Sequence, residues 1–172
     1  IDPSSAAGAS TIADLIDDAF LAYNAGRIRE ACRLLEKKIA RDDVLVGVSL
    51  AGALTPAGLG LSCIIPLMHM GLIDWISSTG ANLYHDLHFT LKKNLYRGSP
   101  NYDDAALRQA GIIRIYDVVF EYDVLLSTDA FIRSVVSGHS YEKNAISTAE
   151  LHNIIGRYAA ERERQLGMKH RS

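Results

Sequence analysis

The feature that most constrains this chain is a long uncharged stretch before its midpoint. Between Asp43 and Asp74 the sequence contains no Asp, Glu, Lys or Arg. Its apolar residues form two strand-length blocks, residues 44–50 and 73–78, which end in the small-residue segments LAGALTPAG and STGAN. A helical pattern follows each segment. A buried strand that ends at a small-residue turn and leads into a helix is typical of the cofactor crevice of an open α/β sheet.

Two other interpretations of this stretch stay open. An uncharged run of this length is also typical of a membrane helix, although several residues interrupt it where such a helix would have to run: Pro56, Gly58, Gly60, Ser62, Pro66 and His69. The small residues could instead serve only close helix–strand packing, because the sequence contains neither GxGxxG nor GxxxxGK(S/T). We favour two strands, since turn residues separate the two apolar blocks.

Composition limits the class of protein. A chain of 172 residues with 48% hydrophobic and 22% charged residues is typical of one globular domain. The net charge of −2 predicts neither a nucleic-acid nor a membrane partner. Cys32 and Cys63 show neither disulfide nor zinc-type spacing, so we expect a reduced, cytoplasmic protein without a metal site.

The N-terminal part is predicted to be helical. Its first ten residues, IDPSSAAGAS, lack Met and any signal-peptide pattern, which indicates a trimmed or processed piece. Ser10 or Thr11 is the expected cap of a first helix, with Asp14 in its first turn. Residues 23–26 indicate a break, and a second helix follows it to Ile39.

The remaining elements alternate between strands and helices. We predict helices over residues 57–70, 83–94 and 123–136, a loop over 96–110, short strands over 112–115 and 118–120, and a last helix capped by Ser147 and Glu150 that ends near Leu166. Two parallel strands are too few for a doubly wound sheet, and the chain stops after a helix. We therefore expect another polypeptide to complete the sheet.

Several segments together resemble the deoxyhypusine synthase family. They are LAGALTPAGL, STGANLYHD, AFLAYNAGR, GIIRIYDVVF and AISTAELHNIIGRYAAER, and the resemblance extends from about Ile12 to Ser172. It looks closest to the bacterial and archaeal-type members. It implies a Rossmann-like α/β fold whose parallel sheet has flanking helices and binds NAD. Residues 42–172 would be the N-terminal part of that domain, preceded by a helical extension over residues 1–41.

The resemblance also implies an activity. Family members generally form tetramers with active sites at subunit interfaces. They move an aminobutyl group from spermidine to a protein lysine, and related enzymes use putrescine as acceptor and make homospermidine. The chemistry is hydride removal from an amine by NAD, capture of the aminobutyl group by an enzyme lysine, and return of the hydride after transfer.

Site residues follow from the resemblance by position. The implied NAD contacts are Gly52, Ala53, Leu54, Thr55 and Pro56 in the first turn, and Thr79, Gly80 and Ala81 in the second. The residues implied to lie near the polyamine are Tyr84, His85 and Asp86. Eukaryotic members carry acidic residues where this chain has Tyr84 and His85. Because ammonium groups favour carboxylates, neutral partners recognise spermidine less well, and both spermidine and a different amine stay open as the donor.

The nucleophilic lysine is not expected in this chain. In the family it lies in a Trp-Gly-Lys context, whereas the only Trp here is Trp75, within the second strand. Lys92, Lys93 and Lys169 are predicted surface lysines. The chain is therefore interpreted as the N-terminal half of a synthase that needs its C-terminal half as a second chain or segment. Alternatives are a non-catalytic regulatory or scaffolding subunit, and an NAD-dependent oxidoreductase that releases the oxidised amine.

Two histidine features have their own interpretations. His85 and His88 lie three positions apart on one predicted helix, a spacing that also suits metal ligands, although no third ligand is evident. His69 lies in an apolar pattern and is expected to be a core histidine.

Overall fold

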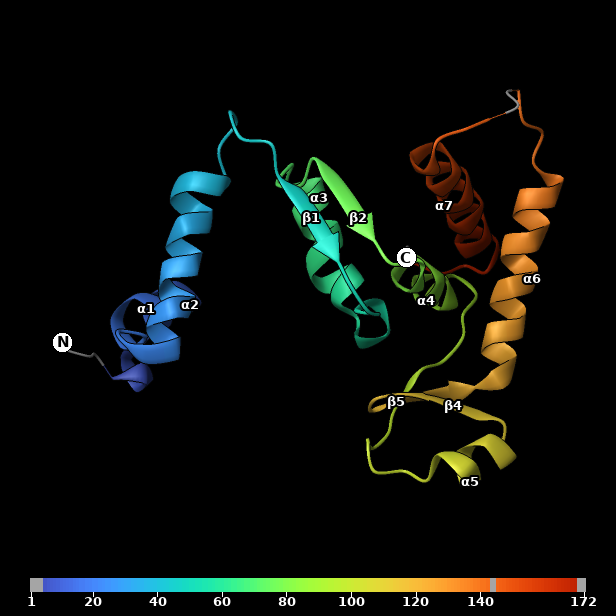
Figure 1. Cartoon of the computed structure of the whole chain (residues 1–172), viewed down its shortest axis with the longest axis horizontal. Coiled ribbons are helices and arrows are strands. Elements are labelled where there is room, and N and C mark those ends of the chain that lie inside the picture. Colours follow the sequence, from blue (N-terminus) through green and yellow to red (C-terminus); the bar gives the residue numbers. More distant parts are fainter. Residues whose placement is uncertain (1–4, 143–144, 170–172) are drawn as a thin grey trace. The chain divides into compact units, whose positions relative to one another are not determined.

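The computed structural model describes residues 5–142 and 145–169, and it is mixed α/β (Figure 1). The chain divides into two compact units. One contains Ile1–Gly47 and Leu72–Trp75, and the other contains Val48–Gly71 and Ile76–Ser172.

The first unit begins with two helices. Helix α1, Ile12–Ala19, has Thr11 as its N-cap, one of the two predicted cap residues, and Asp14 lies in its first turn as predicted. The Thr11 side chain and Asp14 also form a capping box. Helix α2, Tyr23–Leu34, continues as a π-helical turn over Leu35–Ile39. The predicted break at residues 23–26 is wrong, because α2 begins at Tyr23. Gly26 is buried, and a Cβ there would lie 3.3 Å from the Leu21 carbonyl, so this glycine permits a close approach between α2 and the segment that precedes it.

The two apolar blocks form the parallel pair β1, Gly47–Leu50, and β2, Trp75–Ser78 (Figure 1). Both strands are shorter than predicted. The Asp74 carboxylate accepts a hydrogen bond from the Val46 N–H at 2.6 Å, so a side chain takes the place of a ladder partner just before the strands. The prediction of buried strands is wrong, because exposed and half-buried residues alternate along β1 and β2 is mostly exposed. Each strand pairs only with the other within the described residues.

The predicted helix over residues 57–70 is broken into shorter pieces. They are a 3₁₀ turn at Thr55–Ala57, a π-helical turn at Gly60–Ile64 and the short helix α3, Ile65–His69. Gly58 adopts φ +81° and interrupts the helical hydrogen bonding after the first piece. None of the helices in the described part of the chain combines the length and the apolar character needed to cross a membrane.

Exposure corrects one residue assignment. His69, expected in the core, is exposed at the end of α3 because the short helix turns it toward solvent. Cys32 and Cys63 are free thiols and are also exposed.

The middle of the second unit is a small antiparallel sheet. It follows α4, Gly80–Thr90, and has the order β3-β5-β4, with β3 at Tyr96–Arg97, β4 at Ile112–Ile115 and β5 at Val118–Glu121. The strands near 112–120 confirm the prediction, whereas the predicted loop over 96–110 is wrong because it contains β3 and helix α5, Asp104–Gln109.

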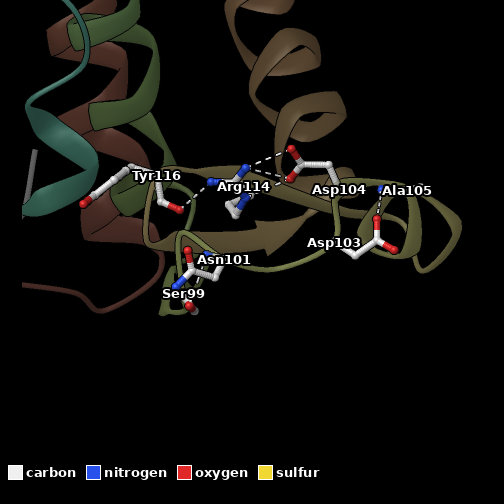
Figure 2. Close-up of polar contacts among 7 residues, drawn as sticks. All are labelled: Ser99, Asn101, Asp103, Asp104, Ala105, Arg114 and Tyr116. Atoms are coloured by element: carbon white, nitrogen blue, oxygen red, sulfur yellow. Dashed lines mark hydrogen bonds and ion pairs between the residues drawn. The ribbon is translucent and has the colours of Figure 1, made fainter.

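A capped helix and an ion pair fix the segment before β4. The Asp103 side chain accepts the Ala105 N–H at 2.9 Å and caps α5 (Figure 2). Arg114 of β4 binds both oxygens of Asp104 and donates to the Tyr116 carbonyl, which joins α5 to the hairpin turn (Figure 2). The bidentate geometry ties a short helix to the sheet.

Two long helices complete the second unit. Helix α6, Tyr122–Gly138, and helix α7, Thr148–Gln165, pack on α4. The predicted Ser147–Glu150 capping box is confirmed at the start of α7. The buried apolar side chains lie on α4, β5, α6 and α7: Leu87, Phe120, Val124, Val135 and Ala159. The core therefore surrounds α4, whose N-terminus follows the second small-residue turn.

Two neighbouring valines of α6 test this placement of the core. Val135 is 3% exposed and Val136 is 40% exposed. We expect Val135→Ala to lower the free energy of unfolding by about 2 kcal/mol, because it removes buried methyl groups and leaves a cavity. The matched control Val136→Ala should change it by less than about 0.5 kcal/mol. Urea titrations followed by far-UV circular dichroism measure both; equal losses would contradict the assignment of the core.

Candidate functional site

The two small-residue turns lie side by side and are hydrogen-bonded to each other. The Thr79 hydroxyl donates to the Gly52 carbonyl at 2.5 Å, and the Thr79 N–H donates to the Leu50 carbonyl at 3.0 Å. Thr79 is the N-cap residue of α4, and Gly52 follows the end of β1. The turns that the sequence predicts to form one site are therefore brought together at the carboxyl ends of β1 and β2.

Asn82 is the residue that holds this arrangement, and sequence reasoning missed it. Its side-chain oxygen accepts the Leu54 N–H at 2.7 Å, and its own carbonyl accepts the Thr55 hydroxyl at 2.7 Å. Its Nδ2 donates to the hydroxyls of Ser78 and Thr79 at 3.1 and 3.2 Å. The available signal was the position of an Asn in the first turn of a helix, directly after the small residues of STGAN.

Several of the predicted cofactor residues leave backbone accessible. A Cβ at Gly52 or Gly80 would meet no atom within 4 Å, and Thr79 is exposed. Gly80 and Ala81 occupy the first positions of α4, where backbone N–H groups have no carbonyl partner within the helix. This helix end can therefore donate hydrogen bonds to an anionic group and adds a partial positive charge.

Other predicted cofactor residues shape the first turn. Thr55 and Pro56 are buried, and the Leu54 N–H is bonded to Asn82. Gly60 packs close by, since a Cβ there would lie 3.0 Å from Thr55 Cγ2 and 3.3 Å from Asp86 Oδ1. These residues set the path of the turn, while contacts of residues 53–56 with a cofactor stay a prediction.

A pocket begins at the same helix end. Its volume is about 580 Å³, within the range of small-molecule sites. Gly80, Tyr84 and Asp86 of α4 line it together with Ile132 of α6 and Leu151 of α7. The pocket thus includes Gly80 from the predicted cofactor residues and Tyr84 and Asp86 from the predicted amine residues, whereas His85 is not among its lining residues.

Tyr84 is held as a hydrogen-bond donor. Its hydroxyl lies 2.7 Å from Asp129 Oδ1 and 3.0 Å from the Leu125 carbonyl oxygen, and both atoms are acceptors on α6. Burial and the Asp129 carboxylate together raise the pKa of Tyr84 above its usual value. The phenol therefore stays protonated and connects the site to a carboxylate on the neighbouring helix.

His85 and His88 form a hydrogen-bonded pair. His85 Nδ1 lies 2.9 Å from His88 Nε2, and His88 Nδ1 lies 2.8 Å from the Thr128 hydroxyl oxygen. Burial lowers the pKa of His85, and burial together with the charge of His85 lowers the pKa of His88 to about 4. Both rings are thus neutral near pH 7.

The hydrogen bond between His85 and His88 also argues against these two rings as joint metal ligands. Facing nitrogens 2.9 Å apart act as donor and acceptor toward each other and do not converge on one ion. Among the described residues, no group of three or more His, Cys, Asp and Glu side chains is arranged to hold a metal ion.

The three lysines predicted to lie at the surface are exposed or half-buried. Lys92 and Lys169 are exposed, and Lys93 Nζ forms a 2.8 Å ion pair with Asp123 while its side chain stays 29% exposed. None of these three lysines belongs to either of the two turns.

Comparisons with known proteins agree with the resemblance. The family model for deoxyhypusine synthase matches residues 15–168. A deoxyhypusine synthase-like protein of Nostoc punctiforme is 51% identical over 99% of this chain and 43% of its own length. One from Cyanothece is 51% identical over all of this chain and 43% of its own length. A probable deoxyhypusine synthase 1 of Methanosarcina acetivorans is 37% identical over 73% of this chain and 39% of its own length. The chain thus spans less than half the length of these relatives.

Asn82 offers a direct test of how the turns are held. Asn82→Leu keeps the approximate shape but removes the acceptor of the Leu54 N–H and the donor to the Ser78 and Thr79 hydroxyls, which keep their bonds to the Thr79 and Gly52 carbonyls. We expect a loss of about 2 kcal/mol in unfolding free energy and faster hydrogen exchange at the Leu54 amide. The exposed Asn24→Leu is the control. Unchanged exchange at Leu54 in Asn82→Leu would show that the turns do not depend on this side chain.

Proposed function

The chain belongs to the deoxyhypusine synthase family, and on this premise we propose that it forms the NAD-binding part of an aminobutyl transferase. One observation carries the proposal: the two small-residue turns meet through Thr79 and Asn82, beside a pocket and at the N-terminus of α4. The proposal includes a Rossmann-like sheet, NAD as cofactor and an amine as substrate.

The residues present fit a dinucleotide phosphate. The Gly80 and Ala81 N–H groups would bind it, Thr79 would add an exposed side chain, and Gly52 leaves open space opposite. Absence of a side chain at Gly80 lets a bulky anion approach the backbone closely. NAD bound there would supply a hydride acceptor, while this chain would bind and orient it.

The amine would lie along the exposed side of α4. Asp86 lines the pocket and supplies a carboxyl group, the kind of partner that an ammonium group favours. The raised pKa of Tyr84 and the lowered pKa of His85 make both side chains neutral partners, so the donor in this proposal is spermidine or a different amine. The acceptor in this proposal is a protein lysine or putrescine.

A second polypeptide or segment would supply the nucleophilic lysine and further strands. Parallel strands are normally covered on both faces, whereas β1 and β2 are largely exposed, and Trp75 is 58% exposed. Coverage by the C-terminal half of the enzyme, within a tetrameric assembly, accounts for these exposed strands. The two free cysteines agree with a reducing, cytoplasmic location.

Gly80→Val tests the cofactor site. A side chain fits this position without a clash, but it would stand in front of the N–H groups at the start of α4. We expect the affinity for NAD to fall about tenfold or more, measured by isothermal titration calorimetry on the assembled enzyme. Gly138→Val, also without a clash and at the far end of α6, is the control. Equal affinities of the two variants would contradict the proposed site.

Borohydride trapping tests the reaction and separates the alternatives. In the assembled enzyme with NAD and either spermidine or homospermidine, we expect mass spectrometry to find a reduced amine adduct on the partner polypeptide and none on this chain. We also expect no accumulation of NADH, because a transferase returns the hydride. Accumulating NADH would favour the oxidoreductase, and an assembly without turnover that still binds an active relative would favour the non-catalytic subunit.

A further inference from the structure

A directed series of hydrogen bonds runs from the backbone of α6 to His85. The Thr128 hydroxyl donates its single hydrogen to the Val124 carbonyl at 2.8 Å. Its oxygen must therefore accept from His88 Nδ1, which lies 2.8 Å away. This makes His88 Nε2 an acceptor, so the hydrogen between the two rings belongs to His85 Nδ1. A carbonyl that can only accept thus fixes the proton positions along the whole series.

The series gives the two histidines different capacities. His88 cannot take up a proton at Nε2 without losing the hydrogen bond from His85. His85 can take up a proton at its remaining nitrogen, Nε2, without breaking any bond of the series. His88 is fully buried, whereas His85 is only half-buried. Of the pair, His85 is therefore the ring with a nitrogen that can take up a proton while the series stays intact, and it lies one residue from Asp86 of the pocket.

The surroundings of His85 favour its neutral form. The Phe120 ring of β5 lies 6.1 Å from the His85 ring, and Tyr84 lies at 5.4 Å. The nearby carboxylates have other contacts: Asp129 of α6 with Tyr84, Asp123 of α6 with Lys93, and Glu163 of α7 with Thr90. Asp86 lies on α4 next to His85, with Oδ1 near Gly60. Burial alone accounts for the lowered pKa of His85.

The reaction proposed above needs such a group. An ammonium ion has no lone pair, and its carbon yields a hydride only after the nitrogen has lost a proton. We propose that His85 Nε2 accepts this proton from the bound amine, with His88 and Thr128 as positioning residues. The N–H bond of the ammonium breaks, its electron pair stays on nitrogen, and a new N–H bond forms at Nε2. This inference rests on the proposed function. It concerns residues whose hydrogen bonds all donate in one direction, from His85 through His88 and Thr128 to the Val124 carbonyl.

Variants of His85 and Thr128 in the assembled enzyme test the inference. With NAD and spermidine or putrescine, His85→Gln should lower kcat by about a hundredfold or more. Because a protonated His85 cannot accept a proton, wild-type kcat/KM should fall at acid pH, and this limb should disappear in His85→Gln. The exposed His69→Gln is the control and should match wild type in both respects.

Thr128→Val separates positioning from mere packing. It keeps the side-chain shape but removes the acceptor for His88 Nδ1, so the hydrogens of both rings can reverse. We expect kcat to fall about tenfold and Thr128→Ser to restore it. Long-range ¹H–¹⁵N spectra of the enzyme without substrate should show hydrogens on Nδ1 of both rings in wild type and a changed pattern in Thr128→Val.

The outcomes are distinguishable. Wild-type turnover with an unaffected His85→Gln would overturn the inference and leave the proposed function intact. Hydrogens on Nε2 of both rings in wild type would overturn the inference without any assay of activity. Lack of turnover by the wild-type assembly, despite NAD binding, would overturn the proposed function and the inference with it.

Discussion

The buried amide of Asn82 is the interaction on which the rest of the site depends. Asn82 is 3% exposed, and its polar atoms contact the first turn, the second turn and the end of β2. A buried polar group that loses a partner costs more free energy than a new contact returns. The two turns are therefore held in one arrangement, which places the start of α4 beside Gly52.

Signals within a few residues of sequence predicted much of the fold. The capping boxes at Thr11 and Ser147, the hairpin strands and helix α6 all depend on local chemistry. Contacts between distant segments were not predictable in this way. Asn82 binds a residue 28 positions away, and His88 meets Thr128 40 positions away. The apolar pattern over residues 57–70 predicted one helix, which is wrong. Apolar spacing does not reveal that Gly58 adopts a left-handed conformation, which interrupts the helix.

The exposed strands show how polar contacts can order a sheet that apolar burial does not stabilise. Asp74 receives the Val46 N–H just before the strands, and Thr79 contacts Leu50 and Gly52 where they end. These contacts set the register from both ends, since a shift by one residue would break them. The geometry of the turns therefore does not require covered strand faces, although stability of the whole sheet would gain from a covering chain.

The structure gives a reason why Tyr84 and His85 can stand at the two positions where the resemblance implies acidic residues in other members. Tyr84 itself carries no negative charge, but its hydroxyl donates a hydrogen bond to Asp129 on α6, so a carboxyl group still lies close to this region. His85 replaces a fixed charge with a neutral acceptor whose proton positions are set through His88 and Thr128. Fixed carboxylates bind an ammonium ion strongly and stabilise its charged form. A neutral acceptor such as His85, whose hydrogen-bond series ends at the Val124 carbonyl, would hold an ammonium ion less tightly, and in the proposed reaction it would favour the deprotonated amine.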